Sequence, residues 1–384
     1  MIKRIKSTRI VTELDTLLDG YLYFDTESGL ITHVGDGTPA FDSEEDIGEL
    51  YLAPGLIDIH THGAAGYDYG EVTSVEQALA ALNYQASRGA TTVLATLTSA
   101  SDESLISALE VMQEVYTRSL AGNLGGVHIE GPFFAPEAAG AQNPEYMTAP
   151  RPELYEKIVE RFGDMILRWD YAPERDKDGT FARYLNSHGI KPSAGHSMAS
   201  AADIGSAMEN GMNLITHLYS CMSTITRRGG FRVLGIIESA YLYDELWAEI
   251  ICDGCHLPEE LLRLIFKTKS HERLVLITDS LKVAGTDAME GSLSGIDFVI
   301  EDGVCKLKDR TAFAGSIATS DTLVRIASTV GGLSVAEAVN LASRNPATLF
   351  GMNKGRLKAG YDADLIVFDE NINISKVLIR AKQI

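Results

Sequence analysis

Five histidines of this 384-residue chain lie at or just after the ends of short β-rich runs, and carboxylates occupy the same place in two further runs. The histidines are His60, His62, His196, His217 and His256, and the carboxylates are Glu130 in GVHIEGPFF and Asp279 in LVLITDS. Imidazole nitrogens are good ligands for zinc and similar cations, and carboxylates complete or bridge such sites. These residue types predict a divalent metal centre, and a bound cation would activate water for hydrolysis.

The spacing within one run supports this hypothesis. His60 and His62 are two residues apart in IDIHTHG, so a strand would direct both side chains to one face. An isolated pair of this kind is usually only a strand with two polar residues, and a single histidine such as His196 is more often a capping residue. The joint placement of imidazoles and carboxylates is what favours a metal site. His128, two residues before Glu130, is interpreted as a buried supporting histidine.

The elements that must position these residues alternate in type between about residues 50 and 350. Helices with clear end signals separate the β-rich runs: capping boxes at Ser74–Gln77 and Ser334–Glu337, a stop at Gly89, and first-turn prolines at Pro152 and Pro258. Such alternation predicts a (β/α)8 TIM-like barrel, whose active sites lie at the carboxyl ends of the strands. A doubly wound open sheet is the alternative fold. Eight strands are expected, at 55–60, 91–98, 124–130, 165–171, 190–194, 213–217, 248–252 and 273–278.

The two ends of the chain differ from this central pattern. Short β-rich pieces separated by turn residues are expected at 9–14, 20–24 and 29–34, and the C-terminal segment contains another strand-like run, GYDADLIVFDEN. We expect residues 1–53 and 355–384 to form one small β-sandwich domain beside a barrel domain of residues 54–354.

Composition restricts the partners and the location. The formal net charge of −20 argues against nucleic acid and anionic membranes, since the field of the protein repels phosphate groups. No run of about 18 apolar residues is present, and the N-terminal segment has no apolar stretch long enough for a signal peptide. Four scattered cysteines do not make a disulfide framework, so a cytoplasmic location is expected. Cys252 and Cys255 have thiol-ligand spacing but lack a second pair.

An anionic small substrate would need local positive charge in so acidic a protein. The tight basic cluster that follows a strand end contains Arg227, Arg228 and Arg232. The planar fork of arginine suits phosphate oxygens, although a solvated loop is the other interpretation.

The order of several motifs resembles the amidohydrolase superfamily and, within it, the family of N-acetylglucosamine-6-phosphate deacetylases. The motifs lie between about Ala53 and Asp369: PGLIDIHTHG, GVHIEGPFF, AGAQNPEYM, AGHS, THLYSCM, CDGCHL, LVLITDS, FAGS and SRNPATLFG. The HxH pair alone marks only the superfamily, whereas EGPF followed by GAQNPEY and THLY is more specific. The fourth strand candidate, MILRWDYAP, has no lysine, unlike that of relatives that carry a carboxylated lysine there.

The resemblance implies a homodimeric, metal-dependent enzyme that deacetylates a small amino-sugar phosphate. Matched by position, Glu130, His196 and His217 are expected to bind one divalent ion, and His60 and His62 a second ion that not all members hold. Zinc is the expected ion, with iron and manganese as alternatives. Asp279 corresponds to the catalytic group, which serves first as base and then as acid. The expected substrate contacts are Ala141, Gln142, Ser220, Cys221, Arg228, His256, Phe313, Ala314 and Gly315.

Three motifs depart from the family pattern. Ser220-Cys221 replaces Asn-Ala, the segment from Arg228 to Phe231 replaces Arg-Glu-Pro-Gly, and Ser280 replaces alanine. These changes spare the expected metal ligands and Asp279 but affect contacts to the sugar and phosphate. Two alternatives therefore stay open: a hydrolase of another N-acylated sugar or cyclic amide, and a non-catalytic sugar-phosphate sensor.

Overall fold

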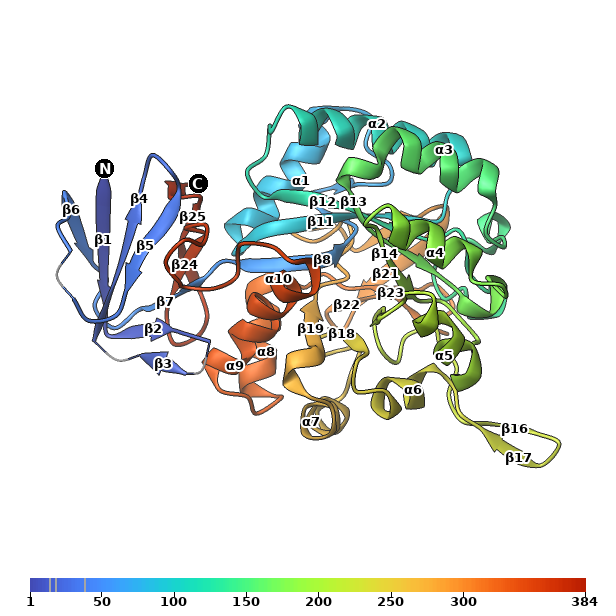
Figure 1. The fold of residues 1–384 in the computed structure, drawn as a ribbon. Coiled ribbons are helices and arrows are strands. Elements are labelled where there is room, and N and C mark those ends of the chain that lie inside the picture. Colours follow the sequence, from blue (N-terminus) through green and yellow to red (C-terminus); the bar gives the residue numbers. More distant parts are fainter. Residues whose placement is uncertain (14, 18, 38) are drawn as a thin grey trace.

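The computed structural model describes residues 1–13, 15–17, 19–37 and 39–384, and a nearly closed barrel of parallel strands forms its centre (Figure 1). The strands pair in the order β19-β18-β15-β14-β13-β12-β11-β8, so each lies beside its neighbours along the chain. A hydrogen bond from Asp279 N to His60 O (2.9 Å) joins the two ends of this order. The strands are β8 (Leu56–Thr61), β11 (Ala90–Thr98), β12 (Leu124–Glu130), β13 (Ile166–Tyr171), β14 (Lys191–Ala194), β15 (Leu214–Ile215), β18 (Trp247–Ile251) and β19 (Leu274–Ile277).

The predicted barrel is confirmed, and its strands lie close to their expected positions. All residues of β8 and β11 are buried, because one face of each strand packs inside the barrel and the other packs under helices. β15 is shorter than expected. His217 has a left-handed backbone (φ 29°), which takes it out of the ladder and ends the strand early.

Helices surround the barrel (Figure 1). Ser334 caps its helix as predicted, accepting a hydrogen bond from Glu337 N at 3.2 Å, and Pro152 begins α3. The predicted box at Ser74 is wrong, because Gln77 Oε1 instead accepts a hydrogen bond from Thr73 N at 2.8 Å. Pro258 stands one residue before its helix rather than in the first turn. The helices are α1 (Val75–Ser87), α2 (Asp102–Thr117), α3 (Pro152–Phe162), α4 (Thr180–Ser187), α5 (Ala201–Glu209), α6 (Ile236–Leu242), α7 (Glu259–Thr268), α8 (Ser320–Thr329), α9 (Val335–Leu341) and α10 (Arg344–Phe350).

The two ends of the chain form a β-sandwich beside the barrel, as expected. One sheet has the order β5-β4-β1-β6 and the other β26-β25-β24-β7-β2-β3. Their inner faces bury a shared apolar cluster that includes Leu22, Phe24, Leu52 and Leu365. The expected piece 9–14 contains β2, and its last residue, Leu14, lies outside the described residues. The exact division at residues 53 and 355 stays a prediction. The strands are β1 (Ile2–Ser7), β2 (Arg9–Val11), β3 (Thr16–Leu17), β4 (Gly20–Asp25), β5 (Leu30–Val34), β6 (Ser43–Asp46), β7 (Tyr51–Pro54), β24 (Leu365–Phe368), β25 (Ile374–Ile379) and β26 (Lys382–Gln383).

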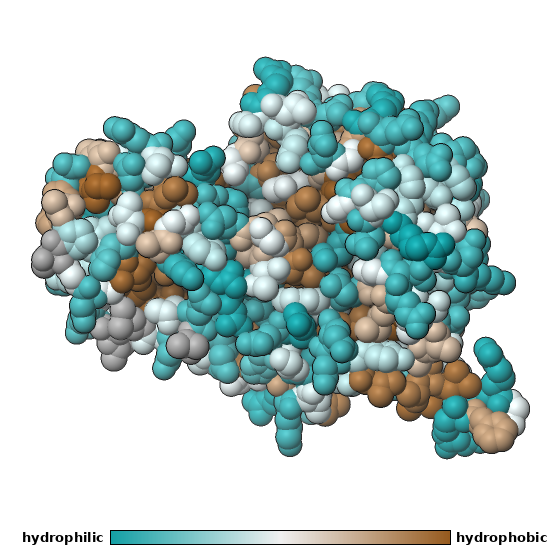
Figure 2. All heavy atoms as spheres, in the orientation of Figure 1, coloured by the Kyte–Doolittle hydropathy of each residue, from teal (hydrophilic) through white to brown (hydrophobic). Residues whose placement is uncertain are grey.

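Two insertions follow barrel strands. After β15, a hairpin of β16 (Thr226–Arg228) and β17 (Phe231–Val233) projects from the body of the protein (Figures 1 and 2). Its turn residues, Gly229 and Gly230, both have positive φ (57° and 88°), as tight hairpin turns favour. After β19, an antiparallel sheet that the sequence reasoning missed contains β20 (Glu290–Leu293), β21 (Ile296–Glu301), β22 (Val304–Leu307) and β23 (Phe313–Gly315).

Short elements complete the description: β9 (Gly63–Ala64) pairs with β10 (Tyr67–Asp68), and single turns of 3-10 helix lie at Pro136–Ala138, Pro144–Tyr146, Gly163–Met165, Pro173–Arg175 and His271–Arg273. Hydrophilic side chains cover most of the face drawn in Figure 2. Within the described ranges, no helix combines the length and apolar character needed to cross a bilayer.

Candidate active site

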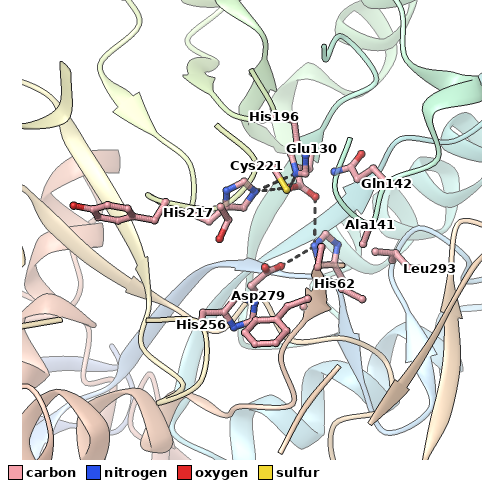
Figure 3. A pocket seen from close by; sticks show the side chains of 16 residues that line it. His62, Glu130, Ala141, Gln142, His196, His217, Cys221, His256, Asp279 and Leu293 are labelled. Carbon is pink, nitrogen blue, oxygen red and sulfur yellow. Dashed lines mark hydrogen bonds and ion pairs between the residues drawn. The ribbon is translucent and has the colours of Figure 1, made fainter. Parts of the chain in front are cut away.

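Three buried side chains at the ends of three barrel strands form a first cluster (Figure 3). Glu130 ends β12, His196 follows β14, and His217 follows β15. Glu130 Oε1 lies 3.1 Å from Nε2 of His196 and 3.1 Å from Nε2 of His217, and the two Nε2 atoms are 3.2 Å apart. Nδ1 of His196 lies 2.9 Å from the carbonyl oxygen of Ala138. An Nδ1–H that donates there leaves the Nε2 lone pair directed at the cluster.

The donor atoms of this first cluster fit a divalent cation. Nitrogen lone pairs that converge on one carboxylate oxygen repel one another unless a proton or a cation lies among them. Ligands about 2.0–2.2 Å from a tetrahedral ion lie roughly 3.3–3.6 Å from each other. The observed separations of 3.1 and 3.2 Å are close to that range. Two imidazoles and one carboxylate suit zinc, and also iron and manganese.

A second cluster contains His60, His62 and Asp279, and Glu130 links it to the first. His62 Nε2 lies 3.1 Å from Asp279 Oδ1 and 3.4 Å from Glu130 Oε2. His60 Nε2 lies 3.6 Å from both Asp279 Oδ1 and Glu130 Oε1, and among the described atoms it has no hydrogen-bond partner. An orphaned buried nitrogen facing two carboxylates is the expected mark of a ligand position. The structure therefore brings together all five predicted ligands and Asp279.

Burial and neighbouring charges act in opposite directions on the ionisable groups of the two clusters. Burial opposes the charged form of His60, yet the adjacent carboxylates of Glu130 and Glu249 raise the pKa of its imidazole well above the usual value. Burial likewise opposes ionisation of Glu130, but the imidazoles of His60, His196 and His217 hold its pKa well below the ordinary range. Hydrogen bonding to His62 lowers the pKa of Asp279 despite burial. The carboxylates thus stay ionised, and a bound cation can replace protons on the imidazoles.

A pocket of about 250 Å³ opens onto these clusters (Figure 3), near the lower end of the size range of small-molecule sites. Expected substrate contacts form much of its wall. Those in the wall are Ala141, Gln142, Ser220, Cys221, His256, Phe313, Ala314 and Gly315. Tyr219, Leu293 and Ala312 also line it and were not expected. Leu293 and Phe313 come from the inserted sheet of β20–β23, so this insertion closes one side of the pocket.

Two pocket side chains have fixed orientations. Gln142 Oε1 accepts a hydrogen bond from Ser99 N at 3.2 Å and a second from the Ser99 hydroxyl. Its buried Nε2 has no partner among the described atoms and is free to donate to a ligand. His256 Nδ1 lies 2.8 Å from Asp253 Oδ2, which leaves Nε2 for the pocket. Ser280, one of the departures, donates from its hydroxyl to Gly63 O at 3.4 Å and replaces no ligand.

Arg228 is placed differently from the other expected contacts. It lies on β16 of the projecting hairpin, is exposed, and does not line the pocket of its own chain within the described residues. Arg227 and Arg232 are paired across the same hairpin and are exposed as well. The basic cluster is therefore present as predicted, but it faces outward.

Sequence reasoning missed a buried ionic network beneath the clusters. Glu249 on β18 and Arg168 on β13 form a fully buried ion pair, and Arg168 Nη2 also lies 2.9 Å from Asp170 Oδ1. The predicted supporting role of His128 fits this network, since its Nε2 lies 3.0 Å from Asp170 Oδ2. Charged residues inside apolar strands, such as the glutamate of WAEII, could have indicated this network, because a buried charge needs a partner of opposite charge.

The family model named Amidohydrolase family matches residues 51–384. The chain belongs to this family, and it is a hydrolytic enzyme with a barrel and a terminal β-sandwich.

Several relatives within the family are N-acetylglucosamine-6-phosphate deacetylases. The chain is 30% identical over 389 residues to an N-acetylglucosamine-6-phosphate deacetylase of Bacillus subtilis, covering 98% of this chain and 95% of the relative. A solved structure of a mutant deacetylase of that name from Mycobacterium smegmatis, in complex with N-acetyl-D-glucosamine-6-phosphate, superimposes with a TM-score of 0.91 at 27% identity, covering 100% and 99% of the two chains. The enzyme from Pasteurella multocida gives 0.92 at 25% identity, covering 100% of each chain.

Proposed function

We propose that this enzyme hydrolyses the acetamide of N-acetylglucosamine 6-phosphate to glucosamine 6-phosphate and acetate. The observation that carries the proposal is Glu130, whose two oxygens face imidazoles of both clusters while Asp279 lies at the edge of the same pocket. The names and coverage of the relatives support the choice of substrate. Eight of the nine expected substrate contacts line the pocket, which also supports it.

The two clusters would hold one or two divalent ions, with zinc as the proposed metal. When bound, such an ion would lower the pKa of a water molecule towards about 7 and polarise the acetyl carbonyl. Asp279 accepts the proton of the attacking water, because its carboxylate is ionised and borders the pocket. It then returns that proton to the departing amine, since an amine leaves only in its protonated form. Gln142 Nε2 donates to an oxygen of the sugar and fixes its orientation.

Recognition of the phosphate requires positive charge at the outer end of the pocket. His256 lines the pocket and is held by Asp253. We propose that Arg228 binds the phosphate, but in the pocket of a second copy, because its own hairpin projects away from the barrel. A homodimer accounts for this placement and for Phe231, which is 80% exposed at the end of the hairpin. Arginine forks would then offset the repulsion between the acidic protein and its anionic substrate.

We also propose a cytoplasmic location. All four cysteines are free thiols, and two of them, Cys252 and Cys305, are buried. A reducing compartment keeps such thiols intact.

A substrate panel tests the proposal. N-acetylglucosamine and other N-acetyl hexosamines, each with and without 6-phosphate, would be assayed for released acetate with the zinc-loaded enzyme. We expect kcat/KM for N-acetylglucosamine 6-phosphate to exceed that for the unphosphorylated sugar by at least about 100-fold, or roughly 3 kcal/mol, the scale of losing charged phosphate contacts. Equal values with and without phosphate would refute the substrate assignment. A preference for another N-acylated sugar would point to the altered residues around Ser220 and Cys221.

A further inference from the structure

One buried carboxylate contacts ligands of both clusters. Glu249 Oε2 accepts a hydrogen bond from His217 N at 3.1 Å and lies 3.2 Å from His60 Nδ1. Its other oxygen pairs with Arg168. The side chains of Glu249, Arg168 and His60 are completely buried. Glu249 thus reaches a side-chain ring in one cluster and a backbone nitrogen in the other.

We propose that Glu249 is the positioning residue that fixes the orientations of His60 and His217, so that both present Nε2 to Glu130. This inference rests on the metal site of the proposed function and adds a residue to it. The Nδ1–H of His60 donates to Glu249, which fixes the tautomer and leaves the Nε2 lone pair for a cation. His217 N is held at a residue whose backbone is left-handed (φ 29°), where it needs a firm partner.

Arg168 keeps this carboxylate in place. Its guanidinium donates to Glu249, to Asp170 and to Thr216 Oγ1, the last at 3.0 Å. A fully buried arginine with two carboxylate partners is rigid, because its planar fork must satisfy several acceptors at fixed directions. The bond from Leu218 N to Glu249 O (2.9 Å) ties the same strand to the loop that carries His217. His60 depends on Glu249 through its side chain, so we expect the His60 cluster to be the more sensitive one.

Zinc affinity is the measurement that tests this role. The purified full chain would be stripped of metal and titrated with zinc against a chromophoric chelator, a readout that does not depend on turnover. Glu249→Gln keeps the shape of the side chain, and Arg168 stays paired with Asp170, so the fold is expected to survive. We expect the zinc dissociation constant to rise 10- to 100-fold, the range seen when partners of metal-bound histidines are removed. Glu249→Asp keeps the charge but retracts the carboxylate from His60, and it should give a similar loss.

A coupling experiment separates positioning from a general structural effect. In a His60→Ala background, Glu249→Gln should weaken zinc binding by less than about threefold further, because the ring that Glu249 positions is gone and only its bond to His217 N is left to act. Asp364→Asn is the matched control: this buried carboxylate pairs with Lys354 (2.5 Å) on the sandwich side and should bind zinc like the wild type.

The outcomes divide clearly. Wild-type zinc affinity in both Glu249 variants overturns the positioning role and leaves the proposed function intact. A full 10- to 100-fold loss that persists without the His60 ring overturns the positioning of His60 and leaves Glu249 acting through His217 alone. A wild-type protein that binds no divalent cation overturns both.

Discussion

Replacement of Asp279 by asparagine tests the proposed proton transfers with little change of shape. The introduced amide can still hydrogen-bond His62, whose Nε2 lies 3.1 Å from the present carboxylate oxygen. The first cluster contains no atom of Asp279, so its cation should stay bound. The substitution therefore removes the proposed base and returning acid while it preserves the pocket and the proposed ligands of the first cluster.

The expected loss follows from the neighbours of Asp279. Positioned proton transfer contributes about 10²- to 10⁴-fold to a rate, or roughly 2.7–5.4 kcal/mol of transition-state stabilisation at 1.36 kcal/mol per factor of ten. Among the described residues that line the pocket, the other carboxylate, Glu130, faces imidazoles of both clusters, and His256 is held by Asp253. The remaining imidazoles of that wall, His62, His196 and His217, are proposed metal ligands, so none of them is free to act as a substitute base. We expect kcat to fall by at least about 10³-fold.

Acetate release from N-acetylglucosamine 6-phosphate would be followed together with elemental analysis of bound zinc. Asp321→Asn is the matched control, because Asp321 is a buried aspartate that pairs with Arg325 (3.3 Å) on α8, away from the pocket. That control should retain wild-type turnover. An Asp279→Asn enzyme with normal zinc content and more than a tenth of the wild-type kcat would refute the assigned role of Asp279.

Further expectations concern the metal, the phosphate and pH. Glu130→Gln removes the carboxylate shared by both clusters and should weaken zinc binding at least about 100-fold, measured by chelator competition. Exhaustive chelation should abolish turnover and lower the Tm, because a ligand that binds only the native state stabilises it. Added zinc should restore both turnover and Tm. Full activity after chelation would contradict the metal site. Arg228→Ala should raise KM about tenfold or more for the phosphorylated sugar and leave KM for the unphosphorylated sugar unchanged, as contacts to one group are lost. Burial lowers the pKa of Lys269 to about 8. The folded protein therefore binds fewer protons than the unfolded chain between pH 8 and the ordinary lysine pKa. The buried ammonium group of Lys269 thus lowers the free energy of unfolding by its full amount below pH 8, and this loss of stability fades as the pH rises. Lys269→Met should raise the Tm at pH 7 and have a smaller effect at pH 10; a larger gain at pH 10 would contradict this account.

The barrel and the meeting of the candidate ligands could be predicted because two periodic rules suffice for them. Parallel strands buried on both faces show as short apolar runs, and residues at their carboxyl ends must meet at one rim of the barrel. His60, Glu130 and Asp279 lie at three such ends, and the structure brings them together. Helix ends were less secure. Gln77 bonds to the backbone of Thr73 rather than completing a box with Ser74, since several polar residues compete at one helix start.

Other features depend on tertiary contacts that no local pattern specifies. Glu249 and Arg168 are 81 residues apart and lie on strands that are not neighbours in the sheet, so only the closed barrel reveals their pairing. The outward position of Arg228 depends on the tight Gly229-Gly230 turn. This turn pairs β16 with β17 in a projecting hairpin, where the sequence indicated only a basic loop. The wall residue Leu293 belongs to the inserted sheet, whose strands follow no barrel repeat.

The backbone at the site explains why these positions resist prediction from conformational preference. His196, His217 and Asp279 all have left-handed backbones, with φ of 43°, 29° and 49°. Each such residue costs of order 1–2 kcal/mol, and the strain persists only where the surroundings hold it. Bonds such as Asp279 N to His60 O at 2.9 Å supply that restraint. Glycine would relieve the strain at all three positions but would bring no ligand or base, so the side chains there are explained by their chemistry and not by the conformation of the chain.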